Sequence, residues 1–279
     1  MIKICDTHND FLTELSNIEI IKYAKFCKDN GVKKICASFF SSKMQETQIL
    51  NQLTTKSNIL KTCGKEFLLH IEDLWWVKSQ IYLDFLLKIK PFSCSLTWNN
   101  DNALAGGTNG KNTLSDWGKF CINQLIKNRI IIDLAHLNKK SFYAVAKILK
   151  INLYCSHTGF YGVKKNKRNL TDKQIDLIVK SGGFIGLFFF DLCIAKDKSK
   201  IFCIEDIVEN LKYFKSHWGC NNIGFGTDYF GIDCYPQDLQ SYKDFENLQK
   251  ALLKEGFSTI EVENIFYKNF KKWLDKCTN

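Results

Sequence analysis

The sequence predicts a single-domain (β/α)8 barrel of the TIM type over residues 1–279, and three observations support this prediction. Short runs rich in β-branched and aromatic residues alternate with segments of helical periodicity along the whole chain. Eight such runs occur, which matches the strand number of that fold. No glycine-rich phosphate turn follows the first run, which argues against the alternative of a doubly wound open sheet.

The predicted strands are short and are distributed over most of the chain. They cover residues 2–5, 32–40, 66–72, 92–98, 129–136, 151–157, 182–190 and 221–228. Helical periodicity lies between them, for example at residues 17–31, 73–90, 139–150, 171–183 and 203–219. Several of these segments end at glycine, the residue that most often closes a helix.

Composition and charge indicate an ordinary globular protein. With 279 residues, 45% hydrophobic and 24% charged, the chain can bury a large core. The formal charge of +10 comes from lysines scattered from end to end, and only Arg129 and Arg168 are arginines. We therefore interpret the charge as a bias in residue usage and predict no nucleic-acid partner.

Two further features concern the cellular environment. No run reaches the roughly 18 uncharged residues of a spanning helix, and no apolar segment follows a basic start. We therefore expect no transmembrane segment and a cytoplasmic location. The twelve cysteines show no CxxC spacing, and four lie inside predicted strands, so we expect reduced core thiols; these four are Cys5, Cys36, Cys94 and Cys155.

Polar residues collect at the C-terminal ends of the predicted strands, where such barrels keep their chemistry. His8 and Asp10 follow the first strand on one face, although such a pair alone is also typical of a turn. The other candidates close or follow later strands: Glu72, His136, His157 and Asp228. Imidazole and carboxylate are ligands that zinc prefers, and even five of these six candidates exceed the need of one tetrahedral ion. We therefore predict two adjacent divalent metal ions that share one carboxylate ligand, with Zn²⁺ as the expected metal.

These residues lie in motifs that resemble those of the membrane (renal) dipeptidase family, zinc dipeptidases with an amidohydrolase-like barrel. The resemblance runs nearly end to end, through DTHND, HIED, DLAH, SHTGFYGVKKNKRNL and IGFGTDYFGI in the family's order. It implies hydrolysis of the peptide bond of dipeptides through a metal-bridging hydroxide. It also implies that His8 and Asp10 hold one zinc ion, that His136 and His157 hold the other, and that Glu72 bridges both.

The same resemblance implies roles for two more residues. Asp228 would serve in proton transfer and contact the substrate amine, and Arg168 would bind the substrate carboxylate. Arginine is rare in this lysine-rich chain, which independently favours a bidentate hydrogen-bonding role for the guanidinium of Arg168. The alternative is an ordinary surface arginine. The expected partner is a small dipeptide, and a homodimer is left open.

The chain departs from the family pattern at three positions. Trp98 stands where many relatives carry a histidine that polarises the scissile carbonyl, and an indole N–H can donate one hydrogen bond but accept none. A role for Trp98 in packing alone is an equally good interpretation. Phe188 and Phe190 replace the Asn and Tyr of the usual NFY, which lowers the polarity near the site and bears on substrate range. The alternatives are a hydrolase of another small amide, lactone or amine, or a catalytically inactive relative.

Four other features receive structural interpretations. His70 is expected to be a hydrogen-bonded core histidine, and His217, at a helix end, is given no catalytic part. The pair Trp75 and Trp76 is interpreted as packing or pocket wall. Residues 106–110, GGTNG, lack the helix and lysine of a phosphate loop and are predicted to form a flexible loop at the active site.

Overall fold

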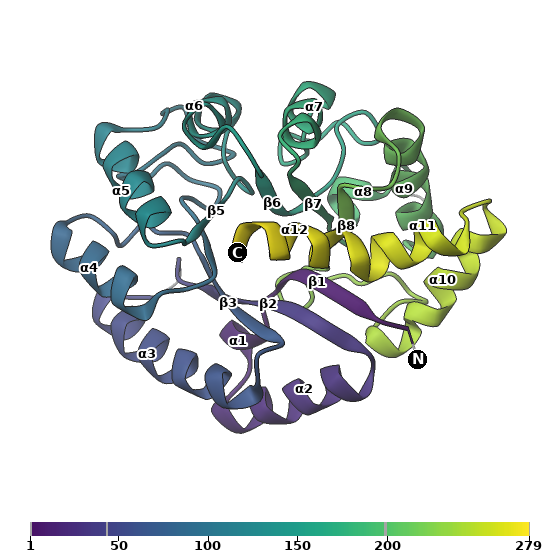
Figure 1. Cartoon of the computed structure of the whole chain (residues 1–279), viewed down its shortest axis with the longest axis horizontal. Helices are drawn as coiled ribbons and strands as arrows, with labels where there is room; N and C mark the ends of the chain where they lie inside the picture. Colours follow the sequence, from purple (N-terminus) through teal and green to yellow (C-terminus); the bar gives the residue numbers. More distant parts are fainter. Residues whose placement is uncertain (1, 43, 198–199, 279) are drawn as a thin grey trace.

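Parallel strands close into a barrel at the centre of the molecule, and helices surround it (Figure 1). The computed structural model describes residues 2–42, 44–197 and 200–278. Within these residues, eight strands pair in chain order and the last returns to the first, which confirms the predicted (β/α)8 barrel. The strands are β1 (Ile4–Asn9), β2 (Val32–Phe40), β3 (Phe67–Glu72), β4 (Ser93–Ser95), β5 (Ile131–Asp133), β6 (Tyr154–Thr158), β7 (Phe184–Leu187) and β8 (Ile223–Phe225).

Amphipathic helices form the outer layer and bury their apolar faces against the strands. Several begin at a side chain that accepts a first-turn N–H, as Ser115 does from Gly118 and Asn138 does from Ser141. The helices are α1 (Phe11–Glu14), α2 (Asn17–Asp29), α3 (Glu46–Cys63), α4 (Gln80–Ile89), α5 (Asp116–Lys127), α6 (Lys139–Leu149), α7 (Asp172–Lys180), α8 (Asp191–Ile194), α9 (Ile204–Trp218), η1 (Tyr242–Asp244), α10 (Phe245–Lys254), α11 (Thr259–Glu263), η2 (Asn264–Lys268) and α12 (Asn269–Thr278).

The C-terminal helix α12 covers the end of the barrel at which the strands begin (Figure 1). Its Trp273 stacks on Tyr154, the first residue of β6, with ring centroids 4.7 Å apart. Its Phe270 packs on Phe184, the first residue of β7, at 5.2 Å. Because this end is closed by a helix, the open end is the one where the strands finish.

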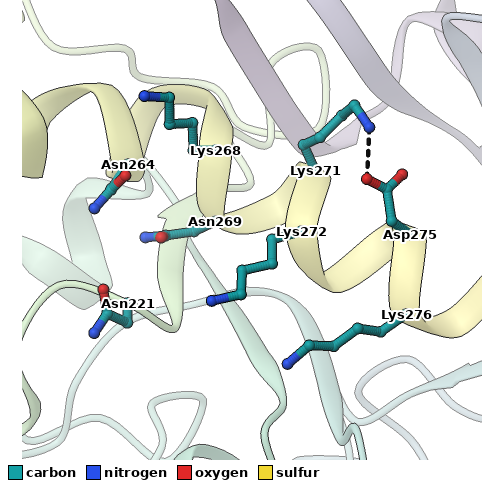
Figure 2. A pocket seen from close by; sticks show the side chains of 8 residues that line it. All are labelled: Asn221, Asn264, Lys268, Asn269, Lys271, Lys272, Asp275 and Lys276. Atoms are coloured by element: carbon teal, nitrogen blue, oxygen red, sulfur yellow. Dashed lines mark hydrogen bonds and ion pairs between the residues drawn. The ribbon is translucent and has the colours of Figure 1, made fainter.

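Beside α12 lies a hollow of about 660 Å³ whose lysines all come from the lysine-rich stretch of residues 268–276 (Figure 2). Lys268, Lys271, Lys272 and Lys276 line it, and Lys271 forms an ion pair with Asp275 at 2.6 Å. Lys268 forms an ion pair with Glu263 of α11, a residue that does not line the hollow. The hollow shares no lining residue with the predicted metal ligands.

Two further expectations can be compared with the fold. The four cysteines predicted to be core thiols are buried and free of disulfides, as expected. No helix within the described part of the chain is long and apolar enough to cross a membrane.

Some predicted boundaries were wrong. β1 does not stop at Cys5 but continues to Asn9, whereas β4, β5 and β8 are only three residues long. The helix predicted from Asp73 begins at Gln80 instead. The intervening segment is a loop because Asp73 has a positive φ of 67° and its carboxylate accepts from the backbone of Trp75 at 3.2 Å.

Candidate active site

The five predicted metal ligands converge at the end of the barrel where the strands finish. His8 lies in β1 and Asp10 directly follows it, Glu72 ends β3, and His157 lies in β6. His136 follows β5 by three residues and has a positive φ of 63°. None of the five is more than 8% exposed, so their polar atoms face one another rather than solvent.

Bulges in two strands bring extra side chains into this end of the barrel. In β6, Cys155 pairs with Ile185 and Thr158 with Leu187, so the two residues between them oppose the single Gly186. In β1, the pairing with β2 shifts in the same way between Asp6 and Asn9. Because a bulge interrupts strict alternation, neighbouring side chains such as Ser156 and His157 can take part in one site.

The two carboxylate oxygens of Glu72 face two different histidine groups. Oε2 lies 3.9 Å from His8 Nε2, which is itself 3.2 Å from Asp10 Oδ2. Oε1 lies 3.2 Å from His136 Nε2 and 3.6 Å from His157 Nε2. Two ligand groups of three residues each therefore share Glu72.

The donor set of these groups fits divalent cations. His8 Nε2 and Glu72 Oε1 are buried and form no hydrogen bond within the described residues, although Asp10 Oδ2 lies 3.2 Å from His8 Nε2. The Nε2 atoms of His136 and His157 face each other at 2.9 Å. His136 Nδ1 lies 3.0 Å from Asn99 Oδ1, which can only accept, so the Nε2 atom of His136 presents a lone pair. Lone pairs that converge without a proton between them are balanced by a cation.

The electrostatics of the two histidine groups differ. Burial disfavours protonation of His8, but the carboxylates of Asp10, Glu72 and Asp228 outweigh it and raise its pKa to about 10. Burial, together with the positive charges around them, lowers the pKa of His136 and His157 well below the usual range. Both are therefore neutral imidazoles at pH 7, the form that binds metal.

Asp228 lies beside the first group. It follows β8 with a positive φ of 63°, and its backbone N–H donates to the carbonyl of His8 at 3.0 Å. Its Oδ1 lies 3.7 Å from His8 Nε2. Burial, with the neighbouring Asp10, raises the pKa of Asp228 to about 8, although His8 opposes this shift. A carboxyl group with such a pKa can exchange a proton near neutrality.

Arg168 and Trp98 lie on the other side of the site, near the second group. Arg168 is half-buried, its Nη2 donates to the carbonyl of His157 at 2.9 Å, and its guanidinium lies 5.4 Å from the ring of Phe188. Trp98 is also half-buried, and its ring lies 6.1 Å from that of His136. Phe190 packs edge-on against Phe188 at 6.0 Å, so the substituted NFY positions form an apolar wall here.

The remaining candidates have mainly structural contacts. His70 is buried and hydrogen-bonds Ser93 Oγ at 2.8 Å, as expected of a core histidine. His217 is exposed in the last turn of α9, away from the ligand groups. Trp76 is fully buried, whereas the indole of Trp75 donates to a backbone carbonyl.

The loop of residues 106–110 directly contacts one of the predicted ligands. Residues 106–110 lie next to the second group, where Thr108 Oγ1 donates to the carbonyl of His136 at 3.0 Å. This contact places the GGTNG loop beside a predicted ligand.

Sequence reasoning missed two buried carboxylates beneath the ligands. Asp6 accepts from the backbone N–H of His8 at 3.2 Å and from the backbone N–H of Thr227 at 2.9 Å, which connects β1 to the segment that follows β8. Asp133 accepts from the backbone N–H of Ser156 at 2.8 Å, which ties β5 to β6. A detectable signal existed for Asp133, an aspartate inside an apolar strand run, where an unpaired charge would be costly. Asp6 gave no such signal, because it begins the polar stretch that follows the first predicted strand.

A closed parallel barrel whose strand ends gather histidines and carboxylates into two linked ligand groups is the arrangement typical of metal-dependent barrel hydrolases. A sequence model of the membrane dipeptidase family (peptidase family M19) matches residues 78–278. Because the matched residues make up more than half of the chain, the chain belongs to the membrane dipeptidase family.

Individual relatives are more distant. The chain is 22% identical over 242 residues to the dipeptidase tcpJ of Claviceps purpurea; the match covers 87% of this chain and 52% of that protein, so the chain spans about half of its length. The fold is similar to the crystal structure of the dipeptidase AC, a metallopeptidase of family M19 (TM-score 0.86, 18% identity, 99% of this chain and 98% of that one). It is equally similar to a metallopeptidase from Rhodobacter sphaeroides with a bound phosphinate mimic of the dipeptide L-Ala-D-Ala (TM-score 0.85, 18% identity, 99% of each chain).

Proposed function

We propose that the chain is a binuclear zinc dipeptidase whose catalytic domain comprises residues 1–279. The observation that carries this proposal is the pair of ligand groups that share Glu72. In one group His8 and Asp10 would hold a divalent ion, and in the other His136 and His157 would hold a second. Membership of the membrane dipeptidase family and the dipeptide mimic bound by a similar structure support a dipeptide as the substrate.

Bound divalent ions would lower the pKa of a water molecule from about 15.7 towards about 7 and polarise the scissile carbonyl. The chain's own residues supply the remaining functions. Glu72 holds both halves of the site in a fixed relation through its two oxygens. Asp228, whose Oδ1 lies 3.7 Å from His8 Nε2, would accept a proton from the attacking water in its ionised form and return it to the leaving amine.

Substrate orientation follows from the charges on the two sides of the site. Asp228 and Asp10 form an acidic side that attracts the free amino group of a dipeptide. Arg168 uses one N–H on the carbonyl of His157, and its remaining donors are suited to the terminal carboxylate. Trp98 forms part of the wall beside His136 and contributes shape rather than charge.

The test combines metal analysis with a substrate panel. Purified protein should hold close to two divalent ions per chain and should hydrolyse dipeptides, and a chelator should abolish both. His157→Ala should lose one ion and most of the activity, whereas His217→Ala, a histidine outside the site, should match the wild type.

Several outcomes would contradict the proposal. One ion or none after metal supplementation would refute the binuclear site. Hydrolysis of a lactone or cyclic amide in the same panel, without hydrolysis of any dipeptide, would identify a different barrel hydrolase. A protein that holds two ions but cleaves nothing in the panel would be a catalytically inactive relative.

A further inference from the structure

We propose that Ser156 and Asp133 act as a positioning pair that orients one histidine in each of the two metal sites. This inference rests on the proposed function, because it concerns how the ligands of those sites are held. Ser156 lies in the bulge of β6, and Asp133 ends β5. Both are fully buried, and neither belongs to the predicted ligand set.

The hydroxyl of Ser156 touches three groups, and their chemistry fixes the direction of each contact. Its Oγ contacts Asp133 Oδ2 at very short range, lies 2.8 Å from His157 Nδ1, and lies 3.5 Å from His8 Nδ1. A hydroxyl has one proton to donate and two lone pairs that accept. Burial raises the pKa of Asp133, whereas the hydrogen bonds from Ser156 and Ala135 favour its ionised form. An ionised carboxylate can only accept, so the hydroxyl proton goes to Asp133 and both imidazoles donate from Nδ1.

This direction determines which nitrogen of each histidine can bind metal. In a neutral imidazole whose Nδ1 carries the proton, the lone pair lies on Nε2, the atom that faces the carboxylates. His8, which is protonated on both nitrogens without metal, reaches this form when a metal ion replaces its Nε2 proton. For His8 those neighbours are Asp10 and Glu72, and for His157 the neighbour is Glu72. A single serine thus selects the tautomer of one histidine in each ligand group. It links the two sites through the Nδ1 atoms, on the side of each ring opposite the metal-binding Nε2.

Asp133 is itself fixed by backbone donors. Its Oδ1 accepts from the N–H of Ser156 at 2.8 Å and from the N–H of Ala135 at 3.0 Å. These two donors leave Oδ2 directed at the hydroxyl of Ser156. The carboxylate therefore cannot turn away without losing two buried hydrogen bonds.

The backbone of Ser156 is held as tightly as its side chain. Thr7 Oγ1 donates to the carbonyl of Ser156 at 2.6 Å. A Cβ at Gly186 or at Gly226 would lie 1.9 Å from that same carbonyl oxygen, so the neighbouring strands approach as closely as glycine allows. The hydroxyl is thus presented from a backbone that has no room to shift.

The third histidine provides a matched control because it uses a different partner. His136 Nδ1 lies 3.0 Å from Asn99 Oδ1 and has no contact with Ser156 in the described structure. Loss of Asn99 should therefore affect one metal site, whereas loss of the serine hydroxyl should affect both.

The experiment measures the two metal dissociation constants of the full-length chain by chelator competition with Co²⁺ and Zn²⁺. Ser156→Ala should raise both constants, by roughly ten- to a hundredfold for the ion held by His157 and by less for the ion held by His8, whose contact is longer. Asn99→Ala should raise only one. The coupling would be overturned if both dissociation constants of Ser156→Ala equalled those of the wild type. It would also be overturned if Ser156→Ala raised only the one constant that Asn99→Ala raises.

A second variant tests the direction of the hydrogen bonds. In Asp133→Asn the two backbone donors would keep the amide oxygen, so the amide N–H₂ would face Ser156 and reverse the hydroxyl. His157 should then carry its proton on Nε2 and release its metal ion, while His136 keeps its own on Nδ1. Nitrogen-15 NMR of the histidine rings reports both tautomers.

The outcomes separate this inference from the proposed function. Asp133→Asn with the wild-type tautomer of His157 and wild-type metal constants would overturn the positioning pair. If that variant does not fold, Ser156→Ala alone decides, since it removes one buried oxygen and adds nothing. Wild-type protein that holds fewer than two ions would instead refute the proposed function.

Discussion

Gly231 allows the two carboxylates of Asp10 and Asp228 to approach each other, and the substitution Gly231→Ala should separate them. A Cβ at this position would lie 2.4 Å from Asp10 Oδ2 and 2.5 Å from Asp228 Oδ1, whereas ordinary contacts of a Cβ begin at 3.4 Å. Gly231 is exposed and does not require a positive φ, so alanine fits the backbone and only the carboxylates must move.

The required movement sets the size of the effect. The carboxylates must retreat by about 1 Å, and a misplacement of that size in a catalytic site costs roughly a hundredfold in rate. We therefore expect kcat/KM for a dipeptide to fall about a hundredfold, which corresponds to roughly 2.7 kcal/mol of transition-state stabilisation. The free energy of unfolding should fall as well, because the added methyl group displaces the buried carboxylate of Asp10.

The assay compares dipeptide hydrolysis, metal content and thermal unfolding in two alanine variants. Gly224→Ala is the matched control, because its added methyl would press on Phe184 and on the backbone of Ile265 in the core, away from the carboxylates. This control should melt at a lower temperature and keep the kcat/KM of the folded enzyme. A Gly231→Ala protein with wild-type kcat/KM and metal content would refute the assigned importance of Asp10 and Asp228.

Two further predictions concern charge. Arg168→Lys should lower kcat/KM for a free dipeptide roughly ten- to a hundredfold and leave the same dipeptide amide nearly unchanged, because a bidentate contact with a carboxylate is worth about 1.5 to 3 kcal/mol; equal losses for both substrates would contradict this role. In the presence of a chelator, the free energy of unfolding should fall as pH rises from 6.5 towards 10, because the raised pKa of His8 makes the folded state bind more protons than the unfolded state over that range. His8→Gln should flatten this fall in urea unfolding measured at successive pH values, and an unchanged slope would count against the raised pKa.

The fold and the convergence of the candidate ligands could be predicted because both follow simple periodic rules. Eight apolar runs separated by helical segments specify a barrel, and the barrel places strand ends together. His136 and His157 were found in this way although they are 21 residues apart, and the structure brings their Nε2 atoms to 2.9 Å.

The details that failed depend on partners that the local sequence does not contain. The polar stretch from Asp6 to Asn9 has the composition of a loop, yet it continues β1 because Thr227 and the barrel interior satisfy its polar groups. The bulge that places Ser156 beside His157 depends on the register with Gly186 in the next strand. Register between strands is a tertiary property, so no window of sequence reveals it.

The departures from the family motifs give the site two chemically different halves. The half around His8 is lined by the carboxyl groups of Asp10 and Asp228, where His8 favours negative charge although burial and the mutual proximity of the two carboxyl groups oppose it. The half around His157 instead meets Phe188, whose ring lies 6.1 Å away and also packs against Arg168. Anchoring a substrate by its amine in the first half and by its carboxylate in the second would place its single peptide bond between the two ligand groups. A longer peptide would have to extend past one of these anchors, and this geometric limit is the physical reason to expect a preference for dipeptides.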